Sequence, residues 1–268
     1  MLRVKLSVVC ALVLMTAALG LAGCSTAVVD KTVGMSPNAI YAEAKDAVDI
    51  GQFDKAIPLY EKLEARAAGT PLAQQAQLDK AYAQYRTQEP AQAIATLDRF
   101  MKLHPASPAL DYALYLKGII NFNDDLGMFS SISRQDLSER DQKASKEAFE
   151  SFKELTTRFP DSRYTPDAKQ RMNYIVGSLA QYEVHVARYY YKRGAYLAAV
   201  NRAQVAVTDF RDVPALEEAL FIIYRSYDAL GMVQLRDDAK RILETSYPSS
   251  EFLTKGERST SDPWWKVW

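Results

Sequence analysis

The chain has 268 residues, of which 33 are Lys or Arg and 33 are Asp or Glu, so its formal net charge is zero. This balance argues against a nucleic-acid-binding protein, which would carry a clear basic excess. The length allows one large or two small folded domains with a hydrophobic core.

The first residues have the layout of a bacterial lipoprotein signal. Two basic residues precede an apolar run that ends in Leu21-Ala22-Gly23-Cys24, which matches a lipobox. We therefore expect residues 1–23 to be a signal peptide that is removed, and Cys24 to be acylated. An ordinary signal peptide or a short transmembrane helix is the alternative, although the run is shorter than the ~20 residues that span a bilayer comfortably. Ser25, where inner-membrane lipoproteins typically carry Asp, favours the outer membrane and a periplasmic orientation.

Most of the remaining chain has helical periodicity. Residues 24–35 lack a sustained period and are expected to link the lipid to the folded body. From Ser36 to about residue 248, an early alanine followed by bulky apolar residues and often a proline recurs about five times, as in Ala56 and Ala93. Units of about 34 to 40 residues are typical of tetratricopeptide (TPR) repeats. We predict an all-α fold, a TPR solenoid of about five helix-turn-helix hairpins, rather than an ordinary helical bundle.

The repeats are not uniform. N-terminal hairpins are expected at 36–105 and C-terminal hairpins at 163–248, with one unusually long helix at about 165–191. Residues 121–143 form an insertion that either folds onto the scaffold or clamps a partner. The tail 249–268 is polar and ends in a segment with all three tryptophans, which could pack on the last hairpin, anchor a partner or touch a membrane.

Residues suited to catalysis or metal binding are scarce. The two histidines, His104 and His185, are far apart and lack the spacing of a zinc site or a catalytic triad. Cys10 lies in the signal and Cys24 is the lipidation site, so neither a disulfide nor a cysteine metal site is expected. We expect no enzyme and no cofactor beyond the covalent lipid, although a pair of glycosidase carboxylates leaves no pattern that would exclude it.

A stack of hairpins presents a concave surface, lined mainly by the first helix of each hairpin, that suits extended peptides. The candidate lining residues combine aromatic faces with polar groups, and each of them could instead pack between repeats. They are Tyr41, Lys45, Asp79, Tyr82 and Tyr85.

Three segments, 97–105, 111–118 and 186–202, resemble the BamD (ComL-like) family of outer-membrane lipoproteins. The last two contain the strings D-Y-x-x-Y-x-x-G and Y-Y-x-x-R-G-A-x-x-x-x-V-N-R, which generic TPR proteins do not share. The resemblance covers nearly the whole mature chain. The C-terminal Trp-Trp-Lys-Val-Trp departs from the best-known members, so no role is carried over to it.

The resemblance implies a scaffold of the β-barrel assembly machinery. The C-terminal hairpins would bind the periplasmic POTRA domain of BamA nearest the barrel, and the N-terminal hairpins would bind the C-terminal targeting signals of unfolded outer-membrane β-barrel proteins. Other lipoproteins of the machinery would be further partners, and the lipid would hold the chain at the inner leaflet of the outer membrane. Arg193, Asn201 and Arg202 are the candidates for the BamA-binding surface, because arginine pairs bidentately with carboxylates. An intramolecular bridge is the alternative for these side chains.

Two other functions fit an acylated helical rod. One is a pilotin-like TPR lipoprotein that escorts secretin subunits, although a pilotin needs neither the insertion nor the V-N-R string. The other is a peptidoglycan-associated lipoprotein or cell-wall enzyme, which binding to purified sacculi would reveal.

Overall fold

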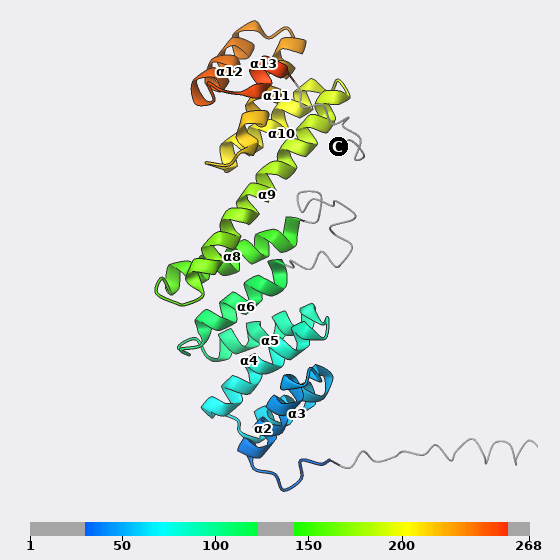
Figure 1. The fold of residues 1–268 in the computed structure, drawn as a ribbon, viewed down its shortest axis with the longest axis vertical. Helices are drawn as coiled ribbons and strands as arrows, with labels where there is room; N and C mark the ends of the chain where they lie inside the picture. Colours follow the sequence, from blue (N-terminus) through cyan, green and yellow to red (C-terminus); the bar gives the residue numbers. More distant parts are fainter. Residues whose placement is uncertain (1–29, 123–141, 257–268) are drawn as a thin grey trace, which may run out of the picture.

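The computed structural model describes residues 30–122 and 142–256, and the helices in these two ranges form a rod of stacked hairpins (Figure 1). Five hairpins follow one another along this part of the chain, and the short helix α13 (Glu251–Lys255) follows the last. The hairpins are α2 (Pro37–Asp49) with α3 (Phe53–Arg66), α4 (Pro71–Arg86) with α5 (Pro90–Leu103), α6 (Leu110–Phe122) with α8 (Gln142–Arg158), α9 (Thr165–Lys192) with α10 (Tyr196–Asp209), and α11 (Ala215–Ala229) with α12 (Val233–Ser246). The prediction of an all-α solenoid of about five hairpins is confirmed.

Local sequence signals explain where helices begin and hairpins turn. The Ser36 hydroxyl accepts a hydrogen bond from the backbone N–H of Ala39 at 3.2 Å and thereby caps α2. Thr70 caps α4 in the same way. Gly51, at the turn between α2 and α3, has a φ of +75°, a conformation that glycine adopts without steric cost. The first hairpin is therefore bounded by residues that favour its ends.

Small residues set the distance between the paired helices. Ala56, Ala93, Ala148 and Ala199, near the start of the second helix of each of four hairpins, are fully buried. In the third hairpin the close approach occurs at Gly118, where a Cβ atom would overlap the ring of Phe152. The recurrent alanines of the sequence are thus the contact points of the hairpins.

Helix α9 belongs to two parts of the rod, as its predicted length suggested. Ile175 and Leu179 pack into the cluster around Phe152 in the third hairpin. Val184 and Ala187 pack into the cluster of the fourth and fifth hairpins. One continuous helix therefore connects the middle of the rod to its C-terminal end (Figure 1).

The structure describes the edges of two predicted segments. Within the linker expected at 24–35, the chain is bound to α3 from Asp30 onward. At the edges of the insertion expected at 121–143, Asn121 and Phe122 belong to α6 and α8 begins at Gln142. Cys24, the central part of the insertion and the tryptophans of the tail lie outside the described residues. Among the residues that are described, no helix has the length and hydropathy needed to cross a membrane.

Candidate functional site

A groove on the N-terminal half of the rod is the first candidate site. It lies between α4, α6 and the turn before α9, and has a volume of about 550 Å³. The side chains that give it chemical character are two carboxylates, two phenols and a guanidinium. They belong to Asp79, Asp111, Tyr112, Arg163 and Tyr164.

The carboxylates accept hydrogen bonds from uncharged groups. Asp79 accepts from the hydroxyl of Tyr41 at 2.9 Å and from the amide of Gln75 at 3.0 Å. Asp111 accepts from the hydroxyl of Ser162 at 2.6 Å. Neither forms an ion pair with a residue in the described part of the chain. Both retain lone pairs for a further donor, since each carboxylate has about four acceptor sites.

The aromatic side of the groove is a cluster of stacked rings. Tyr115 and Tyr164 stack with ring centroids 4.7 Å apart, and Tyr112 lies 5.6 Å from Tyr164. The guanidinium of Arg163 lies over the Tyr164 ring at 4.7 Å. Burial raises the pKa of Tyr112, and burial together with the charge of Asp79 raises the pKa of Tyr41 to about 12. Both phenols are neutral at neutral pH, and that of Tyr41 donates its proton to Asp79.

The five residues predicted to line the concave surface have different surroundings. Only Asp79 lines this cavity, and Tyr41 is hydrogen-bonded to it. Tyr82 packs edge-on against Phe53 at the start of α3, with ring centroids 6.1 Å apart. Tyr85 packs against the core between the second and third hairpins, and Lys45 is half-buried on α2.

Of the five residues that give the groove its chemical character, four were not among the predicted ones: Asp111, Tyr112, Arg163 and Tyr164. A signal for two of them was present, because Asp111-Tyr112 opens the D-Y-x-x-Y-x-x-G string at the start of a first helix. Arg163 and Tyr164 lie in a turn that the repeat pattern does not describe. Whether they line the groove depends on how α9 stacks on α6.

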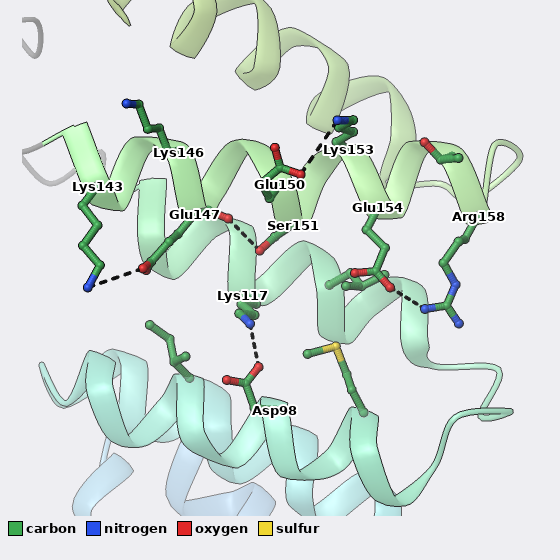
Figure 2. A pocket seen from close by; sticks show the side chains of 14 residues that line it. Asp98, Lys117, Lys143, Lys146, Glu147, Glu150, Ser151, Lys153, Glu154 and Arg158 are labelled. Carbon is green, nitrogen blue, oxygen red and sulfur yellow. Dashed lines mark hydrogen bonds and ion pairs between the residues drawn. The ribbon is translucent and has the colours of Figure 1, made fainter.

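A larger groove of about 1000 Å³ lies between α5 and α8 (Figure 2). Its charged side chains largely neutralise one another, as in the pairs Lys117 with Asp98 at 2.6 Å and Arg158 with Glu154 at 2.5 Å. It contains neither histidine nor cysteine. Nor does any group of three potential metal-ligating side chains gather within residues 30–122 and 142–256. The groove thus offers a charged surface whose ionic groups are largely paired.

The residues proposed for the BamA-binding surface lie on the fourth hairpin. The guanidinium of Arg193 lies over the ring of Tyr189 at 4.8 Å, at the turn between α9 and α10. Asn201 and Arg202 lie on α10, and Arg202 donates to Glu183 of α9 at 3.0 Å. The Arg202 side chain is 45% exposed, so it remains accessible while it forms this bridge.

Exposed apolar side chains surround the turns of the last two hairpins, and sequence analysis did not single them out. They lie at the turn between α9 and α10 and at the turn between α11 and α12, which both join a first helix to a second helix. They are Tyr189, Leu197, Leu230, Met232, Val233 and Leu235. Apolar surface left open at neighbouring turns is typical of a protein-binding surface.

Sequence comparison agrees with these observations. A family described as "Outer membrane lipoprotein" matches residues 34–243. The outer membrane protein assembly factor BamD of Neisseria meningitidis serogroup A is 44% identical, with 96% of this chain and 98% of the relative covered. BamD of Vibrio cholerae is 32% identical, with 83% and 92% covered. The solved structure of MamA has a TM-score of 0.33 at 18% identity, over 83% of this chain and 96% of that chain.

The fold defines a TPR-like helical solenoid, and the relatives are named as outer membrane protein assembly factors. The chain belongs to the BamD family of outer membrane lipoproteins. Its role is in outer membrane protein assembly, and it is associated with the outer membrane.

Proposed function

We propose that this protein is a non-catalytic scaffold of the β-barrel assembly machinery that binds BamA and the targeting signals of unfolded outer-membrane proteins. Lipid on Cys24 anchors it with the rod in the periplasm, and the lipid is its only covalent addition. The observation that carries the proposal is the groove at Asp79 and Tyr112, which combines hydrogen-bond acceptors with aromatic surface on the N-terminal half of the rod.

The groove suits an extended peptide that contains aromatic side chains. The carboxylates of Asp79 and Asp111 can accept from backbone N–H groups that a peptide leaves unpaired, and charged acceptors form the stronger hydrogen bonds. The rings of Tyr112 and Tyr164 can stack with an aromatic side chain of the peptide, at about 0.5–1.5 kcal/mol per pair. Arg163 at the edge adds a cation that can bind a peptide carboxylate.

The C-terminal hairpins supply the surface for the POTRA domain of BamA. The exposed apolar residues at the two turns give contact area, and Arg193 and Arg202 give charged groups beside it. Arginine and tyrosine are the residue types that most often dominate binding energy at interfaces. Other lipoproteins of the machinery can use the remaining surface of the rod.

Binding both partners to one rod promotes assembly without catalysis. Once a targeting signal occupies the groove and BamA occupies the C-terminal hairpins, the two face each other at a high effective concentration. The lipid on Cys24 adds to this effect by keeping the rod next to the membrane in which BamA resides.

The test is the binding of a fluorescent peptide with the last-strand sequence of an outer-membrane β-barrel protein. Replacing both Asp79 and Arg163 by Ala should weaken binding roughly thirtyfold, because two charged contacts of about 1 kcal/mol each are lost. Replacing Asp237 and Arg236 by Ala is the matched control, since these residues form an exposed ion pair in the fifth hairpin. Equal affinities of the two double variants would contradict the assignment of the groove.

A further inference from the structure

We propose that the turn at residues 31–34 is a second membrane contact, which lies against anionic lipid headgroups and sets the orientation of the rod. The proposal rests on the anchor at Cys24 and goes beyond it, because an acyl chain alone leaves the protein free to rotate. The observation behind it is a set of contacts that hold the chain just after the lipidation site against the first hairpin.

The contacts form a latch between residues 30–32 and α3. Asp30 accepts hydrogen bonds from Lys62 at 2.5 Å and from the hydroxyl of Thr32 at 2.6 Å. Arg66 donates to the carbonyl oxygen of Thr32 at 2.6 Å and to its hydroxyl at 3.0 Å. The hydrogen bonds from Lys62 and Thr32 hold the pKa of Asp30 well below its usual range, so the carboxylate stays charged over the physiological pH range. The chain is therefore fixed to the rod from Asp30 onward.

The latch buries one side chain of the turn and leaves the side chains on either side of it exposed. Thr32 is 1% exposed, whereas its neighbours Lys31 and Val33 are exposed. At 75%, Val33 is the most exposed of the large hydrophobic side chains in the described residues. A lysine beside an exposed apolar residue suits a membrane interface, where the ammonium reaches the headgroups and the apolar group enters the acyl boundary.

The position of the turn in the chain identifies lipid as its partner. The chain from Cys24 to Asp30 spans at most about 20 Å even when fully extended. The turn also lies at the same end of the rod as the first hairpin (Figure 1). It cannot move farther from the membrane than this short segment allows.

The local charge favours anionic lipids. Lys31, Lys62 and Arg66 are within this region, and only Asp30 among the latch residues opposes them. The side chains of Lys62 and Arg66 are still 38% and 34% exposed while they bind Asp30. An excess of basic groups near the surface is attracted to anionic headgroups within about one Debye length. The first hairpin would thus face the membrane.

The experiment uses the lipidated full-length mature chain in vesicles of phosphatidylethanolamine and phosphatidylglycerol. A spin label on Val33→Cys reports whether the turn is in the lipid interface, through its accessibility to oxygen and to a water-soluble nickel complex. Leu197→Cys is the matched control, because Leu197 is an exposed apolar residue of the fourth hairpin, 62% exposed. The label at residue 33 should be shielded from nickel, and the label at residue 197 should not.

Two further variants test the latch and the headgroups. Replacing both Asp30 and Thr32 by Ala should abolish the shielding at residue 33, and so should Lys31→Glu. Nickel access at residue 33 equal to that at residue 197 would overturn the proposal, and so would equal shielding in uncharged phosphatidylcholine vesicles. Shielding that appears only after BamA is added would overturn it as well, since it would mark a protein contact.

The test of the membrane contact can fail independently of the peptide-binding test of the proposed function. Peptide binding in the groove does not involve Lys31 or Val33, so a Lys31→Glu protein should bind the peptide normally whether or not the turn touches lipid. Failure of the wild-type protein to float with vesicles would contradict the anchor at Cys24 and the turn proposal together.

Discussion

Arg202 has an intramolecular partner that affects how its role can be tested. Its guanidinium donates to Glu183, whose side chain is only 11% exposed, while that of Arg202 is 45% exposed. A charge reversal at Arg202 would therefore place two carboxylates together inside the fourth hairpin. A loss of BamA binding in that variant could come from the partner surface or from the hairpin itself.

A charge swap separates these two explanations. Arg202→Glu alone should lower Tm, at a cost of about 1 kcal/mol for a partly exposed pair, and should weaken binding to the soluble POTRA domains roughly tenfold. Adding Glu183→Arg restores the intramolecular pair, so Tm should recover. Binding should not recover if the BamA surface requires the positive charge at residue 202. A swap that restored both quantities would assign Arg202 to the hairpin alone.

The groove shows why site residues were harder to predict than the repeats. Asp79 was predicted because it lies on a first helix near tyrosines, and the structure places it in the groove. Tyr112 and Tyr164 come from the third hairpin and from the turn before α9, and they meet only because of the angle at which the hairpins stack. Periodicity defines the face of one helix but not that angle, so the convergence of three segments was not accessible from the sequence.

At the scale of elements, Glu64 joins the first two hairpins. It accepts hydrogen bonds from Gln77 at 2.8 Å and from Lys80 at 3.0 Å, both on α4, and pairs with Arg99 of α5 at 2.5 Å. Burial tends to raise the pKa of Glu64, but these hydrogen bonds and the charges of Lys80 and Arg99 lower it below its usual value. Three helices thus depend on one ionised carboxylate.

This arrangement predicts a pH-dependent stability. A lowered folded-state pKa stabilises the protein fully above the unfolded-state value of about 4.3, and the stabilisation is lost as the pH falls through the folded-state pKa. Glu64→Gln should lower the free energy of unfolding at pH 7 by about 2 kcal/mol, because Lys80 is left buried beside a neutral amide.

The measurement is urea unfolding of the wild type and of Glu64→Gln from pH 7 to pH 3. The difference between the two proteins should shrink as the pH falls. Glu154→Gln is the control, since Glu154 pairs with Arg158 on the surface. This substitution should change the free energy of unfolding by less than about 1 kcal/mol at any pH. A difference that stayed constant with pH would show that the charge of Glu64 is not what joins the hairpins.

The elements themselves were largely accessible from the sequence. Alanine spacing, the Ser36 cap and the turn at Gly51 are local signals, and each of them coincides with an observed boundary or contact. The latch at Asp30 was not accessible, because the segment has no periodicity and its partners Lys62 and Arg66 lie about 30 residues farther along the chain. Long-range polar contacts of this kind have no pattern in a single sequence.

At the scale of the whole molecule, α9 sets how the N-terminal and C-terminal parts of the rod are oriented relative to each other. Its N-terminal half packs into the third hairpin and its C-terminal half into the fourth and fifth, without a break between Leu179 and Ala180. The peptide groove lies before this helix and the proposed BamA surface after it. The relative orientation of the two surfaces therefore depends on α9 staying straight.

Gly177 allows this dependence to be tested, because it lies in the middle of α9 and nothing within 4 Å opposes a Cβ atom there. Gly177→Pro should kink or break the helix at a cost of about 3 kcal/mol, whereas Gly177→Ala should stabilise it by about 0.5–1 kcal/mol. Peptide affinity and POTRA affinity, each measured alone, should change little in both variants, since neither surface includes residue 177. Assembly of a β-barrel substrate in vesicles that contain BamA should fall in the proline variant and persist in the alanine variant. Full assembly activity of a folded Gly177→Pro protein would mean that the two surfaces work independently of their orientation, and that α9 only supplies length.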